Sequence, residues 1–223
     1  MPEGVSLPVL AQVSRAPVRP PASALRRARR LAGLGVAWHA VEALVAVGAG
    51  LIAGSVALVG FGADSLVEGL AGVVVVWRLG SSRVASQRAE RRAQRLIGAS
   101  FAVIAVYVSV EAVRTLTTAR HPEVSLIGIG LSAFTLLVMP PLARAKARVA
   151  HRLGSSATAS EGRQNMLCAY LSGALLVGLA GNAVAGWWWA DPLVALLIAG
   201  VALREAGRAW RGQHCGCCPA PPG

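Results

Sequence analysis

The sequence has few charged residues for its length. Only 14% of its 223 residues are Asp, Glu, Lys or Arg, whereas a soluble domain has roughly 25%. Hydrophobic residues make up 55% of the chain. Such a chain has too little polar surface to face water on all sides, and it is too apolar to be disordered. We therefore expect an integral membrane protein, and the composition argues against a water-soluble enzyme.

Acidic residues and lysine are scarce. There are 10 Asp and Glu against 22 Lys and Arg, for a formal net charge of +12, and Lys146 is the single lysine. A basic excess can indicate nucleic-acid binding, a membrane surface or the topology signal of a membrane protein. The preference for Arg, together with abundant Ala, Gly and Val, is typical of a GC-rich bacterial genome. We therefore expect a multi-pass protein of the bacterial inner (plasma) membrane.

Cysteine is also scarce, and motifs for catalysis are absent. Three of the four cysteines lie in the last nine residues, which excludes a disulfide framework. The sequence contains no H-E-x-x-H motif, no phosphate-cradling glycine loop and no nucleophile–base pair. We expect no enzyme activity, no catalytic residue and no resident cofactor.

Six apolar segments follow a proline- and arginine-rich start that lacks the apolar run of a signal peptide. Inside lipid each backbone amide must be satisfied within its own segment, so the segments are expected to be helices. The predicted fold is an all-α bundle of six transmembrane helices over residues 31–205. We expect a disordered basic tail at 1–30 and a short tail at 206–223. The six segments are 31–53, 55–79, 96–116, 124–142, 166–183 and 187–203.

The basic residues lie almost entirely on one side of these segments. The N-terminal tail, the second and fourth connections and the C-terminal tail together hold 20 of the 22, and only Arg114 and Arg120 lie on the other side. The positive-inside rule places both termini in the cytoplasm. Topology therefore accounts for the basic excess, and no nucleic-acid partner is expected. Trp187, Trp188 and Trp189 suit an interfacial aromatic belt on the far side.

Asp64 and Glu68 lie inside the second apolar segment. A carboxylate near mid-bilayer costs at least ~2.5–3.5 kcal/mol, and the i, i+4 spacing places both on one helical face. Two neighbouring carboxylates repel each other in a low dielectric, and a divalent cation removes that conflict. A protonated, hydrogen-bonded pair that only fixes helix packing is the alternative, and spacing alone leaves both open.

Three further groups of residues carry candidate chemistry. Gln164 and Cys168 repeat the i, i+4 spacing, and a thiolate suits zinc or a related metal, although a buried Cys also packs as a small hydrophobe. His39 and Glu42 form either a proton relay or a hydrogen bond between helices. Glu111 is three residues from Arg114, which predicts an ion pair.

The C-terminal tail packs four metal-binding side chains into five residues. Such a tract binds soft cations, but residues so close together cannot all surround one ion without strain. We expect either an accessory metal-collecting site or simple thiol reactivity. The four residues are His214, Cys215, Cys217 and Cys218.

The stretch from Gly54 to Glu68 resembles the second helix of the cation diffusion facilitator family. Residues 164–172 and 186–192 resemble the fifth and sixth helices of a short bacterial branch of that family, and the resemblance spans about residues 31–211. It implies a six-helix exporter that exchanges a divalent metal ion, Zn²⁺ above all, for protons. It also implies a homodimer in the lipid bilayer.

The resemblance also implies a metal site and a correction to one helix. Asp64 and Glu68 would bind one ion together with Gln164 and Cys168, where zinc exporters of the family carry His and Asp. For Cys168 to meet Asp64, the fifth helix must begin near residues 155–156. Only about twenty residues follow the sixth helix, so the family's cytoplasmic C-terminal domain is not expected here. A membrane-anchored metal sensor that uses its Cys-rich tail is the competing hypothesis.

Overall fold

The structure is a computed structural model that describes residues 22–80, 87–153 and 156–211, and all of its regular structure is helical. Within these residues there are six helices and no strand, so the expected all-α fold is confirmed. The helices are α1 (Ala22–Ala53), α2 (Val56–Gly80), α3 (Gln87–Thr117), α4 (Leu126–Leu153), α5 (Ser156–Ala185) and α6 (Ala190–Trp210).

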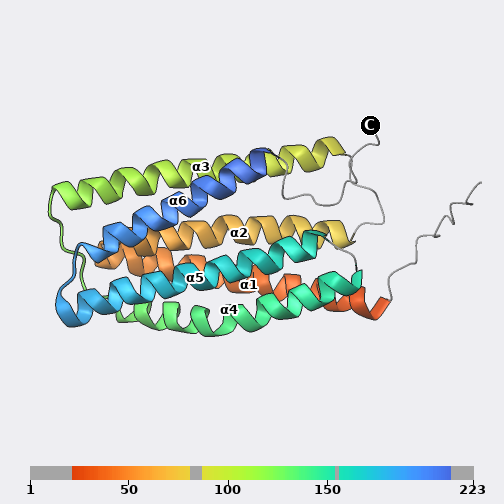
Figure 1. The fold of residues 1–223 in the computed structure, drawn as a ribbon, viewed down its shortest axis with the longest axis horizontal. Coiled ribbons are helices and arrows are strands. Elements are labelled where there is room, and N and C mark those ends of the chain that lie inside the picture. Colours follow the sequence, from red (N-terminus) through yellow and green to blue (C-terminus); the bar gives the residue numbers. More distant parts are fainter. Residues whose placement is uncertain (1–21, 81–86, 154–155, 212–223) are drawn as a thin grey trace, which may run out of the picture.

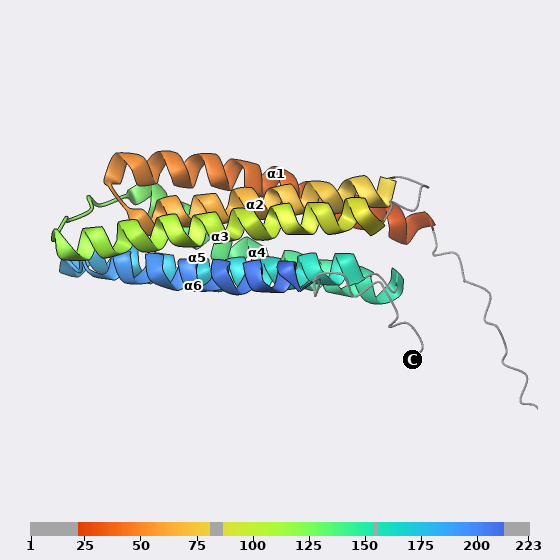
Figure 2. The same ribbon diagram turned by 90° about the horizontal axis from the view of Figure 1, so that it is seen from above.

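Most of the helices have the length and the apolar composition of membrane-spanning helices. Among the described residues, α1 to α5 each contain a segment that is long and apolar enough to cross a bilayer. The shorter α6 carries Asp191 at its start and Arg204 and Glu205 near its end. It runs beside α3 within the bundle, as both ribbon views show (Figures 1 and 2). The chain is therefore a multi-helix membrane protein.

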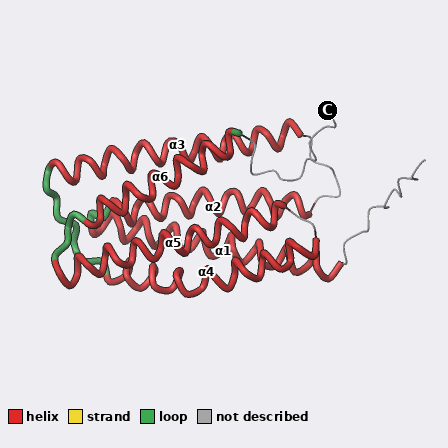
Figure 3. The backbone as a smooth tube through the Cα atoms, in the orientation of Figure 1, coloured by secondary structure: helices red, strands yellow, loops and turns green. Residues whose placement is uncertain are grey.

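The six helices run antiparallel in chain order. The connections α1–α2, α3–α4 and α5–α6 lie together at one end of the bundle, here called the outer end, as the green loops of Figure 3 show. The opposite end, where α1 begins, is called the basic end because it carries the expected cytoplasmic arginines. Within the described residues this arrangement agrees with the predicted topology.

Three pairs of helices make the most extensive contacts, namely α1 with α2, α4 with α5, and α3 with α6. Helix α2 also packs against α3, α5 and α6, so it occupies the centre of the bundle. Helices α1, α2, α4 and α5 form a four-helix group. The α3–α6 pair joins this group through α2 and α5.

Several helices are longer than the apolar segments that predict them. Helix α1 already begins at Ala22, so residues 22–30 are helical, and that part of the expected disordered tail is corrected. Helix α4 continues through Pro140 and Pro141 to Leu153, well past the predicted end at residue 142. Apolarity limits only the part of a helix that lies in lipid. Proline is tolerated in such a helix because neighbouring groups satisfy the released carbonyl.

The start of the fifth helix is the opposite case. Helix α5 begins at Ser156, ten residues before the apolar run at Met166. The resemblance to the cation diffusion facilitators predicted this early start, and the structure confirms it. The polar first turns of α5 contain Glu161 and Asn165, and both are buried.

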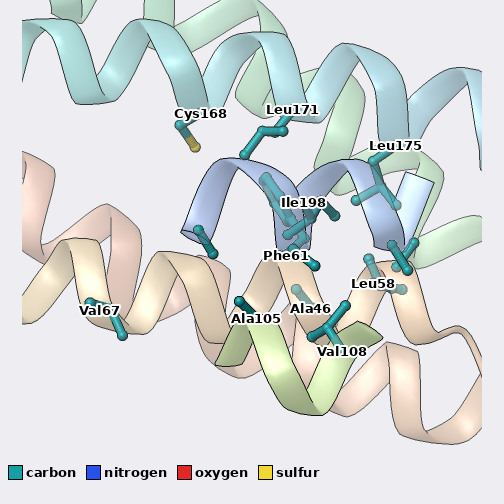
Figure 4. Close-up of a cluster of buried hydrophobic side chains, with 14 of the residues drawn as sticks. Ala46, Leu58, Phe61, Val67, Ala105, Val108, Cys168, Leu171, Leu175 and Ile198 are labelled. Atoms are coloured by element: carbon teal, nitrogen blue, oxygen red, sulfur yellow. The ribbon is translucent and has the colours of Figure 1, made fainter. Parts of the chain in front are cut away.

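The hydrophobic core lies where α2, α3, α5 and α6 meet. Phe61, Val108, Leu175 and Ile198 are completely buried there (Figure 4). Close contact between α1 and α2 depends on glycine, because a Cβ at Gly62 would lie 2.8 Å from Val47 Cγ2.

Asp191 connects the first turn of α6 to the start of α2. Its carboxylate accepts hydrogen bonds from the Ser55 hydroxyl, the Val56 N–H at 2.9 Å and the Ala57 N–H at 3.3 Å. The first N–H groups of a helix have no partner within the helix. A carboxylate both bonds these groups and interacts favourably with the helix dipole. Asp191, in the first turn of α6, therefore also caps α2.

Candidate metal centre

Three metal-binding side chains from three helices converge in the four-helix group. His39 of α1, Glu68 of α2 and Cys168 of α5 are all buried, and each offers one ligand atom within 4.8 Å of the others. Zinc is bound at ~2.0–2.3 Å by this mixture of nitrogen, oxygen and sulfur. Small side-chain adjustments would therefore place all three atoms around one ion.

The imidazole of His39 lies between two carboxylates. Its Nδ1 is 3.2 Å from Glu42 Oε2, and its Nε2 is 3.6 Å from Glu68 Oε2. The Glu42 contact orients the ring, as carboxylates do for metal-binding histidines. The sequence offered His39 and Glu42 as a proton relay or as a hydrogen bond between helices, and it did not predict His39 as a metal ligand.

Glu42 is completely buried and is the centre of a hydrogen-bond network. It accepts hydrogen bonds from the Ser65 hydroxyl at 2.9 Å and from the Thr135 hydroxyl, and the Cys168 thiol lies 3.7 Å from its Oε2. The network joins α1, α2, α4 and α5. Ser65 and Thr135 were not predicted, because a hydroxyl within an apolar segment also bonds its own helix backbone.

The two remaining predicted ligands lie on the same helices as Glu68 and Cys168. Asp64 is buried on α2, one turn from Glu68, and Gln164 is half-buried on α5, one turn from Cys168. Asp64 is not one of the three acidic, histidine and cysteine side chains that converge. Within the described residues Glu68 Oε2 accepts no hydrogen bond, so this oxygen is available to a ligand.

The electrostatics of the cluster favour a cation. Glu42, Asp64 and Glu68 bring three carboxyl groups into the buried interior of two adjacent helices. Like charges repel strongly in such a medium. Protons or a bound cation must therefore compensate these groups.

A second buried polar cluster lies one to two helical turns closer to the basic end. Lys146 Nζ is 3.1 Å from Glu161 Oε2 and donates a hydrogen bond of 2.9 Å to Asn165 Oδ1. From its place in the fourth connection, Lys146 was expected among the cytoplasmic basic residues. That interpretation is corrected: Lys146 lies in α4 and is only 3% exposed. Its neighbours Arg144 and Arg148 are exposed, as expected.

The outer end of the bundle holds the expected ion pair. Arg114 Nη1 lies 3.0 Å from Glu111 Oε1, which confirms the predicted pair. A cleft of about 350 Å³ lies beside them, lined in part by Tyr107 and Arg120. The predicted tail cluster of His214, Cys215, Cys217 and Cys218 lies outside the described residues.

Comparison with known proteins identifies the family of this bundle. Residues 34–211 match the family of the cation efflux transmembrane domain. The chain belongs to the cation efflux family. The match includes all six helices except the first turns of α1, and it includes every residue of the two buried clusters, which confirms the resemblance drawn from the sequence.

A curated relative of this cation efflux protein is an uncharacterized transporter, sll1263, from Synechocystis sp. (strain ATCC 27184 / PCC 6803 / Kazusa). The two sequences are 28% identical over 197 residues, which cover 85% of this chain and 62% of the relative. The chain thus spans less than two thirds of the length of that relative. The family is one of transporters, in agreement with the expectation of a membrane transport protein.

Proposed function

We propose that the protein exports a divalent metal ion, with Zn²⁺ as its preferred cargo, from the cytoplasm in exchange for protons. The convergence of His39, Glu68 and Cys168 carries this proposal. We assign these three side chains as ligands and Asp64 as the fourth, with Gln164 at the edge of the site. One nitrogen, one sulfur and carboxylate oxygens suit zinc.

Competition between metal and protons provides the coupling. A metal ion binds the ionised carboxylates, the thiolate and the neutral imidazole, so its binding releases protons. A high proton concentration on the outer side favours the reverse exchange and releases the metal. The cycle needs two conformations that differ in their affinity for the metal ion and for protons. It needs no covalent intermediate.

The packing suggests which parts move. Helices α3 and α6 pack mainly against each other and contact the four-helix group through α2 and α5. The ligands all lie in that group, on α1, α2 and α5. Rocking of the α3–α6 pair against the group would open the site toward one end at a time, as in other alternating-access transporters. The protein would work as a homodimer in the bacterial inner membrane.

The test measures Zn²⁺ uptake into proteoliposomes under an imposed proton gradient. It compares the wild-type protein with the Glu68→Gln variant. The proposal predicts gradient-driven Zn²⁺ flux in the wild type and its loss in the variant. Glu111→Gln is the matched control, since this carboxylate lies at the outer end, and it should retain flux. Equal flux in all three proteins would refute the proposed site. Zinc binding without flux in any of them would favour the sensor hypothesis.

A further inference from the structure

The cluster around Lys146 has a fixed position relative to the proposed metal site. Gly35 precedes His39 by four residues on α1, Gly72 follows Glu68 by four on α2, and Glu161 precedes Cys168 by seven on α5. At ~1.5 Å per residue, four residues span about 6 Å of helix. The cluster therefore lies one to two turns from the site, between it and the basic end.

A glycine makes room for the ammonium group of Lys146. A Cβ at Gly35 would lie 2.7 Å from Lys146 Nζ, so the ammonium group occupies the space that a side chain on α1 would fill. Glu161 Oε1 lies beside α2, because a Cβ at Gly72 would be in ordinary van der Waals contact with it at 3.9 Å. Lysine and glutamate thus reach from α4 and α5 across the interior of the four-helix group to α1 and α2.

The oxygens of this cluster are suited to a cation. Glu161 is 8% exposed, and within the described residues neither of its carboxylate oxygens has a hydrogen-bond partner, although Oε2 is in ionic contact with Lys146. Asn165 adds an amide oxygen, which already accepts the ammonium hydrogen bond. Carboxylate and amide oxygens are ligands for divalent ions.

The choice of lysine at this position is unusual for this chain. The other 21 basic residues are all arginine, and the one lysine is buried. Arginine carries a broad planar group, whereas the lysine ammonium is a compact charge on a flexible stem. The compact ammonium group of Lys146 can therefore leave the oxygens of Glu161 and Asn165 and return to them, as a metal ion bound there would.

We propose that Glu161 and Asn165 form a second cation station between the metal centre and the basic end, and that the ammonium group of Lys146 occupies this station whenever no metal ion is passing. Lys146 is thus a tethered counter-ion that an incoming ion must displace. The inference rests on the proposed function for the direction of ion movement, but the station itself can be tested without transport.

The experiment measures the number of Co²⁺ or Zn²⁺ ions bound per chain by equilibrium dialysis of the purified full-length protein. His214, Cys215, Cys217 and Cys218 are replaced by serine in every protein so that the tail does not contribute. Lys146→Met empties the station but keeps the length of the side chain. The number bound should rise from about one to about two, and Lys146→Met combined with Glu161→Gln should return it to about one.

A second variant protects the test against misfolding, because Lys146→Met leaves a buried carboxylate without its partner. Gly35→Ala pushes the ammonium away by steric contact and should also produce a second, weaker binding event. Gly33→Ala is its control, since nothing lies within 4 Å of a Cβ there. If the number of bound ions is unchanged in both Lys146→Met and Gly35→Ala, the proposal of a second cation station is wrong.

The outcomes separate this inference from the proposed function. A gain of one ion in Lys146→Met supports the station even if the parent protein binds none and transports none. Conversely, loss of flux in Glu68→Gln with no gain of an ion in Lys146→Met supports the exporter and rejects the station.

Discussion

His39 Nε2 lies 3.6 Å from Glu68 Oε2, and this contact joins α1 to α2 at the level of the Cys168 thiol. Because Nδ1 of the same ring contacts Glu42, the imidazole is held by a carboxylate on each side. A metal ion at this position would replace the His39–Glu68 contact and leave the His39–Glu42 contact as the support that orients its ligand.

Removing the Glu68 ligand should weaken metal binding. Glu68→Gln keeps the shape of the side chain but replaces an anionic oxygen by a neutral amide. We expect the zinc affinity to fall roughly 100-fold, which corresponds to about 2.7 kcal/mol. Isothermal titration calorimetry of the purified protein measures this. Glu111→Gln should bind zinc as the wild type does, and equal affinities in the two variants would contradict the assignment of Glu68.

Replacing the thiol should change the metal preference. Cys168→Ser exchanges a soft sulfur ligand for a hard oxygen, so affinity for Cd²⁺ and Zn²⁺ should fall more than affinity for Mn²⁺. Competition titrations give the ratio, and Co²⁺ provides a direct signal, because its thiolate charge-transfer absorption should be lost in Cys168→Ser. If that absorption persists in the variant, the sulfur ligand is not Cys168.

The hydroxyl of Thr135 should matter for both stability and metal affinity. Thr135→Val preserves the shape but removes a hydrogen bond to the buried Glu42, which should cost ~1–3 kcal/mol of stability. Metal affinity should fall about 10-fold because Glu42 supports His39. Thermal unfolding and calorimetry test the two effects. Thr117→Val is the control, since that hydroxyl is exposed and bonds only its own helix, and it should shift stability by at most ~0.5 kcal/mol.

The cap that Asp191 provides should stabilise the outer end. Asp191→Ala removes the acceptor of the Val56 and Ala57 N–H groups, and a lost cap costs ~0.5–2 kcal/mol. Asp191→Asn retains one oxygen and should lose less. The melting temperature in detergent measures both, with the exposed Glu123→Ala as a control at the same end of the bundle. A melting temperature unaffected by Asp191→Ala would show that the cap contributes nothing to stability.

The membrane character of the helices could be predicted because it depends on local composition. Lipid requires each spanning segment to satisfy its own backbone and to be apolar along its length, so the segments and the placement of the arginines are visible in the sequence. The pairing of Glu111 with Arg114 is also local, at i, i+3. The ends of the helices were less predictable, because a helix such as α4 continues beyond the lipid without any apolar signal.

The metal centre was only partly predictable from the sequence. Spacing placed Asp64 and Glu68 on one face of a helix, and resemblance to the family added Cys168 from another. That His39 joins Glu68 and Cys168, and that Glu42 gathers Ser65 and Thr135, are properties of the packing. Residues up to 129 positions apart, His39 and Cys168, meet in this cluster, and no local periodicity encodes which helix faces which.

The sequence by itself therefore determined that this protein lies in lipid, which segments are helical and in which direction they run. Hydrophobicity and charge act on each segment separately, so these properties are local. Only the tertiary structure decided that the single lysine is buried against Glu161 and that Asp191 caps α2 from the far end of the chain. Both depend on long-range packing, in which the close approach of glycine-bearing helices brings polar groups together away from water.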